Sequence, residues 1–349
     1  MKDKLLLLLL TLLPSMSVWG DVVINEQNFP DENFRNYILS WDIASDGVLT
    51  DAEIAEVTYV SVYKKRVKNL QGIEFFTALT SLDCRENYDL TSLDLSNNTA
   101  LETLNCSYTR LTTLNVSGCM KLIELTCNDA GSLSSLDLSN RTALISLQCL
   151  GCSLSSLDVS GCTALEYLSC PSNQLTTLDV SGCTALRNFD CTNNRLTALD
   201  LSKNAALIYI NCSGNLLTTL DVSACTSLTN INCSVNQIKD TGMDALIESL
   251  PTVEAGRLSV IYNRSGQEKN EITTLQVAAA KAKGWTAYYW DAGTWTAFES
   301  ESDGIQKIGA SKGSNDSIIY NLSGQRIDGR QNGLNIVNGR KVLVKKSLE

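Results

Sequence analysis

Residues 165–185 read LEYLSCPSNQLTTLDVSGCTA, and close copies of this unit fill the middle of the chain. Successive copies begin 21 or 22 residues apart, at Leu79, Leu101, Leu122, Leu144, Leu165, Leu186, Leu207 and Leu228. A looser copy, from Val57 to Ala78, precedes them. A fixed period over such a length predicts an array of stacked coils rather than a single globular core. We therefore expect about eight complete coils and a final half in residues 57–239.

The first half of each unit follows the leucine-rich-repeat pattern L-x-x-L-x-L-x-x-N/C-x-L, with cysteine in the third apolar slot. In a strand, Leu168 and Cys170 point inward and Ser169 points outward. One coil cannot bury its own apolar side, so each coil buries it against its neighbours. The second half, residues 175–181, has the same form and predicts a second short parallel strand. The predicted fold class is a β-rich leucine-rich-repeat solenoid with 21–22-residue coils.

Each of the 13 cysteines occupies a position set by the repeat. Eight lie in the first-strand slot, four lie in the second turn, and Cys152 takes the place of a turn asparagine. Stacked neighbours lie about 4.8 Å apart with parallel Cα–Cβ vectors, whereas a disulfide needs Cβ atoms about 3.8 Å apart. We therefore predict unpaired thiols in the core. The alternative for Cys149-x-x-Cys152 is a redox or metal-binding pair, which no second pair or histidine supports.

A polar residue also recurs at the turn after the first strand. Asparagine occupies this position at Asn173, Asn194, Asn215 and Asn236. Its amide can satisfy backbone groups of adjacent coils. The earlier coils are expected to lack it, because they hold Thr109, Ala130 and Cys152 there.

Residues 1–20 have the form of a signal peptide. Lys2 and Lys4 precede the apolar run Leu5–Leu13, and Pro14 and small residues follow it. The run is too short to span a bilayer, and the sequence contains no comparable later run. The sequence therefore predicts export without a transmembrane span. The alternative is an N-terminal core helix.

Residues 21–56 differ from the repeat and predict a small helical N-terminal cap. Asp42, Asp46 and Glu53 match positions 1, 5 and 12 of an EF-hand calcium loop, with Gly47 at position 6. Ala44 stands where position 3 needs an oxygen ligand. The alternative is a cap without metal, in which Thr50 and Glu53 form a capping box. Calcium at Asp42, Asp46 and Glu53 is the only cofactor that the sequence suggests.

The residues after the array predict three further segments. Residues 240–298 read as an αβ C-terminal cap, residues 299–316 as a polar linker, and residues 317–349 as a small β tail with a hairpin turn at Asn338-Gly339. A cap covers the apolar end of such an array. Its aromatic residues either pack into the cap or form a platform for sugars: Trp285, Tyr288, Tyr289, Trp290 and Trp295.

The two outward faces of the array differ. The outward column on the first strand changes from coil to coil and includes Tyr167, Asn188, Tyr209 and Asn230. Tyrosine is a favoured anchor in binding sites because it buries a large area at a low entropy cost. The second-strand column is nearly uniform, with an aspartate in six coils and Asn115 in one. These aspartates either accept hydrogen bonds from nearby serines and backbone or line up as a cation site. We predict ligand binding on the first-strand face.

Composition restricts the function further. The chain has 28 basic and 38 acidic residues, so a basic footprint for nucleic acid is absent. It has no histidine, which removes histidine-dependent catalysis and histidine-ligated metal sites. A carbohydrate-active enzyme would need paired carboxylates in a cleft, and a repeated aspartate column supplies none. The sequence therefore favours a non-catalytic protein.

The sequence resembles Bacteroidota leucine-rich-repeat surface proteins and, more distantly, internalins. Residues 175–186 carry the likeness of the repeats, residues 29–53 and 278–286 that of the caps, and residues 320–326 that of the C-terminal sorting-type tail. The resemblance implies a secreted protein, delivered to the cell surface or outer membrane, that binds a protein or glycan ligand in adhesion. The alternative is a structural surface scaffold without a specific ligand.

Overall fold

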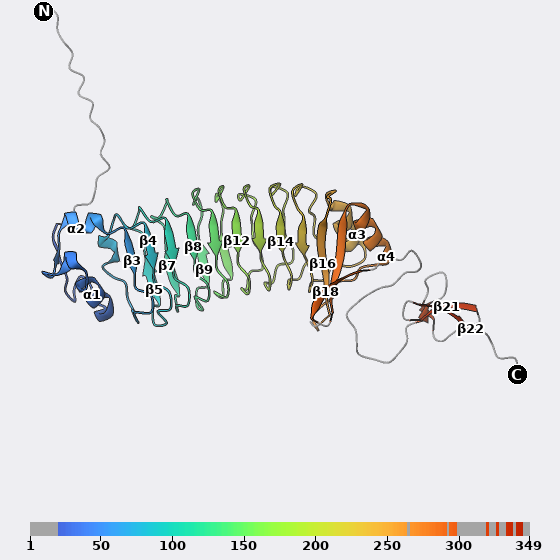
Figure 1. Ribbon diagram of the computed structural model, residues 1–349, viewed down its shortest axis with the longest axis horizontal. Coiled ribbons are helices and arrows are strands. Elements are labelled where there is room, and N and C mark those ends of the chain that lie inside the picture. The colour runs from blue at the N-terminus through green and yellow to red at the C-terminus, as the bar shows by residue number, and fades with distance from the viewer. Residues whose placement is uncertain are drawn as a thin grey trace, which may run out of the picture.

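The computed structural model describes residues 20–263, 266–291 and 293–298, together with four short strands between residues 319 and 344. Residues 20–298 form an elongated β-solenoid with helices at both ends (Figure 1). This architecture confirms the predicted fold class. Almost all of the predicted signal peptide, the whole of the predicted linker and the Asn338-Gly339 turn lie outside the described residues.

One side of the solenoid is a continuous sheet of 12 strands. Each coil adds one strand of three residues, parallel to the last: β3 (Tyr59–Ser61), β4 (Ser81–Asp83), β6 (Thr103–Asn105), β8 (Glu124–Thr126), β10 (Ser146–Gln148), β12 (Tyr167–Ser169), β13 (Asn188–Asp190), β14 (Tyr209–Asn211) and β15 (Asn230–Asn232). The middle residue of each strand is buried, and the outer two form the first-strand face. Strands of the C-terminal cap complete the sheet.

The prediction of a second strand in every coil is wrong for the later coils. Only four second strands form, in two separate pairs: β5 (Ser92–Asp94) with β7 (Thr113–Asn115), and β9 (Ser135–Asp137) with β11 (Ser156–Asp158). Later coils bury the same apolar positions, such as Leu178 and Val180, and keep the backbone bond that precedes them, from Arg195 N to Leu175 O (2.8 Å), but they form no second strand. Apolar packing therefore holds this side without a continuous ladder.

Apolar side chains from both sides fill one core along the whole solenoid. All 13 cysteines are buried in it as free thiols, at the predicted repeat positions. Cys152 replaces a turn asparagine, and its thiol donates to the carbonyl oxygen of Cys127 (2.9 Å). Small apolar thiols therefore pack where a leucine in every slot would be too large.

Buried asparagines form a ladder along the turn after the first strand. The amide nitrogen of Asn194 donates to Cys170 O (3.0 Å) and Cys191 O (3.1 Å), and its oxygen accepts from Leu175 N (3.1 Å). The same set of bonds is made at Asn173, Asn215 and Asn236. Each amide thus joins two coils through backbone groups that would otherwise be buried without partners.

The ladder is longer than the sequence suggests. Asn87, in an early coil, bonds Val62 O (3.0 Å), Cys84 O (2.8 Å) and Val67 N (2.9 Å). The expectation that early coils lack this residue is therefore wrong for the coil that holds Asn87. At the other end Asn270 bonds Cys233 O (2.8 Å) and Ile238 N (2.8 Å), so the C-terminal cap continues the pattern. We call these six asparagines the asparagine ladder.

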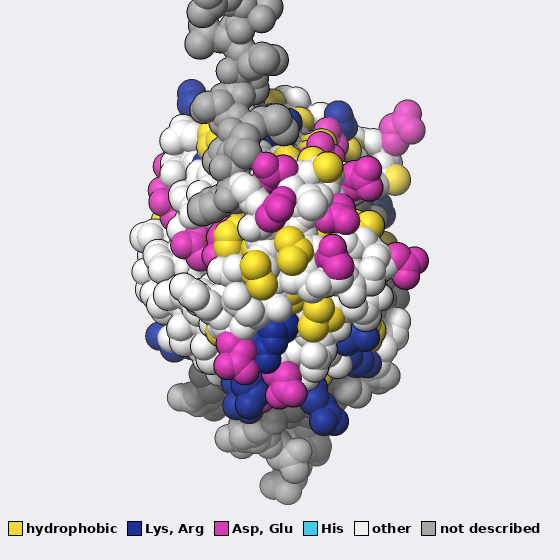
Figure 2. Space-filling model, turned by 90° about the vertical axis from the view of Figure 1, so that its left-hand side faces the viewer, with side chains coloured by type: hydrophobic (Ala, Val, Ile, Leu, Met, Phe, Trp, Pro, Cys, Tyr) yellow, Lys and Arg dark blue, Asp and Glu magenta, His cyan; other side chains and the backbone are white. Residues whose placement is uncertain are grey.

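The N-terminal cap covers the first coil with helices and aromatic rings. It comprises α1 (Glu32–Leu39), a 3-10 turn η1 (Asp42–Ala44), α2 (Asp51–Glu56) and the antiparallel pair β1 (Val22–Val23) and β2 (Val48–Leu49). The ring of Phe29 lies 5.9 Å from Phe34 and 6.4 Å from Phe76 of the first coil. Figure 2, which faces this end, shows a mostly polar surface around a few hydrophobic side chains. The cap thus closes the core.

The C-terminal cap matches its predicted elements. It contains α3 (Thr241–Ser249), β16 (Gly256–Tyr262), α4 (Thr274–Ala282), β17 (Trp285–Asp291) and β18 (Thr294–Ala297). Strands β16 and β17 run parallel to β15, and β18 pairs antiparallel with β17. Trp285 is 1% exposed, and its indole donates to Pro251 O (2.7 Å).

Beyond the cap, four strands form a separate antiparallel sheet in the order β20-β19-β21-β22. They are β19 (Ile319–Tyr320), β20 (Arg326–Ile327), β21 (Gly333–Val337) and β22 (Arg340–Val344). Val337 lies opposite Arg340, as expected for strands joined by a two-residue turn.

Candidate ligand-binding face

The structure brings the four predicted ligand-binding residues together in one column. Tyr167 lies opposite Asn188, Asn188 opposite Tyr209, and Tyr209 opposite Asn230, on four adjacent parallel strands. Tyr167 is 40% exposed, Asn188 is exposed, and the other two are half-buried. With strands about 4.8 Å apart, the two tyrosines are separated by about 10 Å. Partial burial raises the pKa of Tyr209. Its hydroxyl, like that of any tyrosine at neutral pH, carries a proton that it can donate.

The column extends further than the sequence analysis recognised. Tyr59, on β3, begins it and is 58% exposed. Arg257, on β16, follows Asn230 in register. Tyr59 belongs to the looser first unit, and β16 lies outside the 21-residue period, so the spacing alone does not reveal them. The column therefore runs from the N-terminal cap to the C-terminal cap.

The central part of the first-strand face carries little charge. Asp190 is the acidic residue among the outward side chains of β12 to β15, and its carboxylate accepts from Thr192 N (2.9 Å). At the edge of the face, Arg187 pairs with Glu166 (3.6 Å), and both side chains are about half exposed. An exposed pair of this kind adds little stability. The face thus offers amides, hydroxyls and rings rather than a charge pattern.

The second-strand face has a repeated and self-contained hydrogen-bond pattern. Each column residue, from Asp94 to Asp221, accepts a bond from the backbone N–H of the residue two positions later, at 2.8 to 3.0 Å. Hydrogen bonds from Ser139, Ser202 and Ser223 lower the pKa of the aspartates that they contact. This Asx-turn geometry accounts for the aspartates as turn-forming residues.

The carboxylates of the N-terminal cap do not converge on a metal site. Glu53 Oε2 accepts from Thr50 N (2.8 Å) and Thr50 Oγ1 (2.8 Å), which completes the capping box. Asp46 Oδ1 accepts from Val48 N (3.0 Å), and Asp42 lies in η1. Among the described residues, no group of three or more His, Cys, Asp or Glu side chains is arranged to hold a metal ion. Calcium binding at Asp42, Asp46 and Glu53 stays a prediction, which a calcium titration would test.

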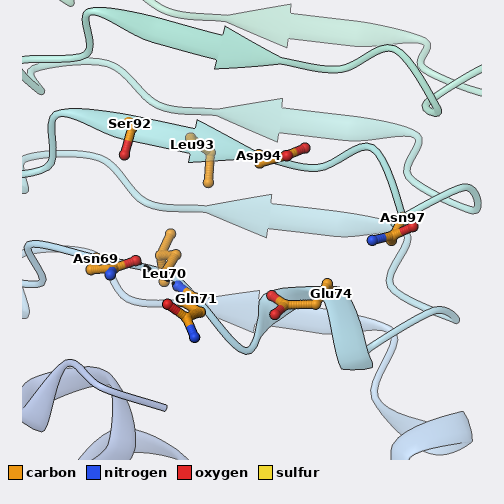
Figure 3. Close-up of a pocket in the computed structure, with 8 residues that line it drawn as sticks. All are labelled: Asn69, Leu70, Gln71, Glu74, Ser92, Leu93, Asp94 and Asn97. Atoms are coloured by element: carbon orange, nitrogen blue, oxygen red, sulfur yellow. Dashed lines mark hydrogen bonds between the residues drawn. The ribbon is translucent and has the colours of Figure 1, made fainter. Parts of the chain in front are cut away.

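A pocket of about 290 Å³ lies where the first coils meet the N-terminal cap, on the side of the second strands. Figure 3 shows residues of β5 on one side and, on the other, the loop that leads into the 3-10 turn η2 (Ile73–Phe75). Its carboxylates already have partners: Glu74 accepts from Gly72 N (2.7 Å), and Asp94 accepts from Asn115 (3.0 Å). We interpret this pocket as a crevice of the fold rather than a ligand site.

The stacked strands, the inward leucine and cysteine columns and the capped ends define a leucine-rich-repeat β-solenoid protein. No family model matches the chain. In sequence it is similar to Internalin J of Listeria monocytogenes serotype 4b (strain F2365), with 36% identity over 72 residues, which are 20% of this chain. The chain spans only 8% of the length of that relative. The repeats are therefore internalin-like.

Among solved structures, the chain is similar to the functional domain of InlJ from Listeria monocytogenes, which includes a cysteine ladder. The TM-score is 0.49 at 29% identity, covering 70% of this chain and 57% of that chain. It is also similar to an internalin C2 of strain 4b F2365, with a TM-score of 0.48 at 21% identity, covering 63% of this chain and 100% of that one. Within the described residues, no helix is both long and apolar enough to cross a membrane.

Proposed function

We propose that this protein is an exported, non-catalytic surface protein that binds a protein or glycan ligand through its first-strand face. The observation that carries the proposal is the column of Tyr167, Asn188, Tyr209 and Asn230, which stands in register on four strands. A specific ligand needs a surface that does not repeat and that offers a few large anchors. The first-strand face meets both requirements, whereas the second-strand face repeats one turn in every coil.

Export and surface delivery are part of the same proposal. They are supported by the signal-peptide form of residues 1–20 and by the small separate sheet of β19 to β22, which follows the caps. A truncation that removes residues 317–349 tests the delivery step. We expect the truncated protein to fold, because the tail sheet is made by its own strands, but to be lost from the surface fraction of the producing cells.

The binding proposal is tested by replacing both tyrosines of the column. Tyr167→Ala with Tyr209→Ala removes two anchors whose side chains lie outside the core, so the melting temperature should change little. Binding to immobilised extracellular-matrix proteins or to a glycan array should weaken by at least about 1 kcal/mol. The matched control is Asp158→Asn with Asp179→Asn on the second-strand face. If the control loses binding and the tyrosine variant does not, the binding face is wrongly assigned. If the wild type binds neither the matrix proteins nor the glycan array, a structural scaffold without a ligand is favoured.

A further inference from the structure

Four aromatic side chains cluster at the C-terminal end of the first-strand face. The ring of Trp290 lies 5.6 Å from Tyr262 and 5.5 Å from Trp295, and Tyr262 lies 6.3 Å from Trp295. The guanidinium of Arg257 stacks on Tyr288 at 4.3 Å and lies 5.9 Å from Trp295. These five residues come from three adjacent strands, β16, β17 and β18, and we call them the aromatic cluster.

The cluster lies on the outer face of the sheet. In β17, Trp285 and Ala287 are buried in the core, so the alternation of a strand directs Tyr288 and Trp290 outward. Trp295 is the cross-strand partner of Trp290 and shares its side. The sequence analysis treated the cap aromatics as one group, but the structure divides them: Trp285 belongs to the core, Tyr289 packs against it, and the others do not.

A β-bulge assembles the cluster. The register of β16 against β17 shifts between Ser259 and Ile261, so that Tyr262 lies opposite Trp290. Without this register shift, Tyr262 would pair one position later and point to the other side of the sheet. Bulges are features that re-aim a side chain, and this one adds a third ring to the two tryptophans.

The solenoid does not need these rings for its stability. Its end is closed by the inward residues of β16 and β17 and by α3 and α4, and all four rings are partly exposed on the opposite side. The indole nitrogen of Trp290 is a buried donor with no hydrogen-bond partner in the described part of the chain. A buried donor without a partner is costly, so a ligand oxygen that reached it after a small side-chain movement would gain a bond.

The surface next to the cluster is neutral and rich in amides. Asn230 stands directly beside Arg257, and Asn211 and Asn232 occupy the neighbouring column. Tyr209 lies three strands from Tyr288, a span of about 14 Å. Arg257 is the one cation of the cluster, and it is stacked on a ring, so an anionic polymer would find few positive charges.

We propose that the aromatic cluster is a binding site for a neutral glycan whose chain continues along the first-strand face toward Tyr209. The faces of sugar rings carry C–H groups with partial positive charge, which are attracted to the negative faces of aromatic rings. Their hydroxyls both donate and accept, as the asparagine amides do. This inference rests on the proposed function, because it names the ligand class and the anchor of the same face.

The test is affinity electrophoresis of the soluble protein in gels that contain one polymer each: yeast mannan, dextran, soluble starch or arabinoxylan, with heparin as the anionic comparison. We expect at least one neutral polymer, and not heparin, to retard the protein. Trp295→Ala with Tyr288→Ala should weaken that retardation at least tenfold. Tyr88→Ala with Tyr108→Ala, which removes two exposed rings outside the column near the other end, should leave it unchanged.

A second variant is needed in case the first one unfolds the hairpin of β17 and β18. If Trp295→Ala with Tyr288→Ala lowers the melting temperature strongly, Tyr288→Leu is used, since it removes one ring, keeps an apolar side chain in its place and should still weaken the retardation. Three results would overturn the inference: retardation by heparin alone, retardation by no polymer, and equal retardation of the wild type and the cluster variants. The inference can fail while the proposed function holds: binding that depends on Tyr167 and Tyr209 but not on the cluster would support the first-strand face and remove only the glycan anchor. Binding that depends on neither pair of residues would overturn both.

Discussion

The two sides of each coil are built from the same kind of apolar column, yet they differ in how the backbone is joined. On the first side, each strand pairs with the next, and the asparagine ladder ties the following turn across coils. On the second side, strands form in only four coils, and the turn is held by a mixed column: Asn98, Cys119, Arg141, Cys162, Cys183, Asn204 and Cys225.

The difference shows which features are free to vary. Backbone hydrogen bonds between neighbouring coils fix the position of every first strand, so the column that holds Tyr167 and Tyr209 can change from coil to coil without loss of register. On the second side each turn needs its own Asx hydrogen bond, and the outward residue is therefore constrained to Asp or Asn. We therefore place the proposed ligand on the side with the continuous sheet.

The largest expected effect comes from breaking the ladder. Asn194→Ala would leave the buried Leu175 N without its partner, while Cys170 O and Cys191 O would each keep one of their two amide donors, from Asn173 and Asn215. We expect a loss of about 2 kcal/mol, because a buried unpaired group costs about 1 to 3 kcal/mol. Chemical unfolding followed by circular dichroism measures it.

The matched variant lies in the second turn of the same region. Cys183 makes one weak bond, from its thiol to Val159 O at 3.6 Å. Cys183→Ala should therefore cost only about 1 kcal/mol, mostly from lost packing. Equal losses for the two variants would mean that the two turns contribute alike and that the comparison between the sides is wrong.

The thiols provide a second comparison of the two sides. Burial raises the pKa of Cys119 and Cys225, in the second turn, to about 11, and it raises the pKa of Cys84 and Cys170, in the first strand, further. Because the thiolate is the reactive form, a short pulse of iodoacetamide should label Cys119 and Cys225 before Cys84 and Cys170. Peptide mapping by mass spectrometry reads the order, and the unfolded protein should expose all 13. Labelling of Cys84 or Cys170 before Cys119 and Cys225 would contradict this.

The repeat period was sufficient to predict the solenoid and the inward columns, because one coil determines the stacking of the next. The period did not predict which coils form a second strand, because coils with the same consensus differ in their backbone contacts on that side. It also missed Asn87 and Asn270, which serve the same role in coils of irregular sequence. Within the candidate site, the register of Tyr167 and Tyr209 followed from the period, whereas the aromatic cluster depends on a bulge that no spacing reveals.

A smaller effect is expected from acid on the second-strand face. Hydrogen bonds from Ser181 and Ser223 lower the pKa of Asp179 and Asp221 below the ordinary value of about 3.9. A lowered pKa in the folded state contributes stability that is present above that ordinary value and is lost as the pH falls through the folded-state pKa. Thermal unfolding between pH 6 and pH 2.5 should show this loss. Asp179→Asn with Asp221→Asn should reduce it, since asparagine forms the same turn at Asn115.

The smallest expected effect concerns calcium. If the carboxylates of the second-strand face and of the N-terminal cap are turn-forming and helix-capping groups, added calcium should not change the melting temperature. In the cap, Glu53 Oε2 already accepts two bonds from Thr50. Glu53→Gln should be nearly neutral, because glutamine serves in a capping box, and Glu53→Ala should cost about 1 kcal/mol. A calcium-dependent rise in the melting temperature that Glu53→Gln abolishes would instead establish the EF-hand interpretation through mass action. A rise lost only in Asp179→Asn with Asp221→Asn would place the ion on the second-strand face and show that this face, too, binds.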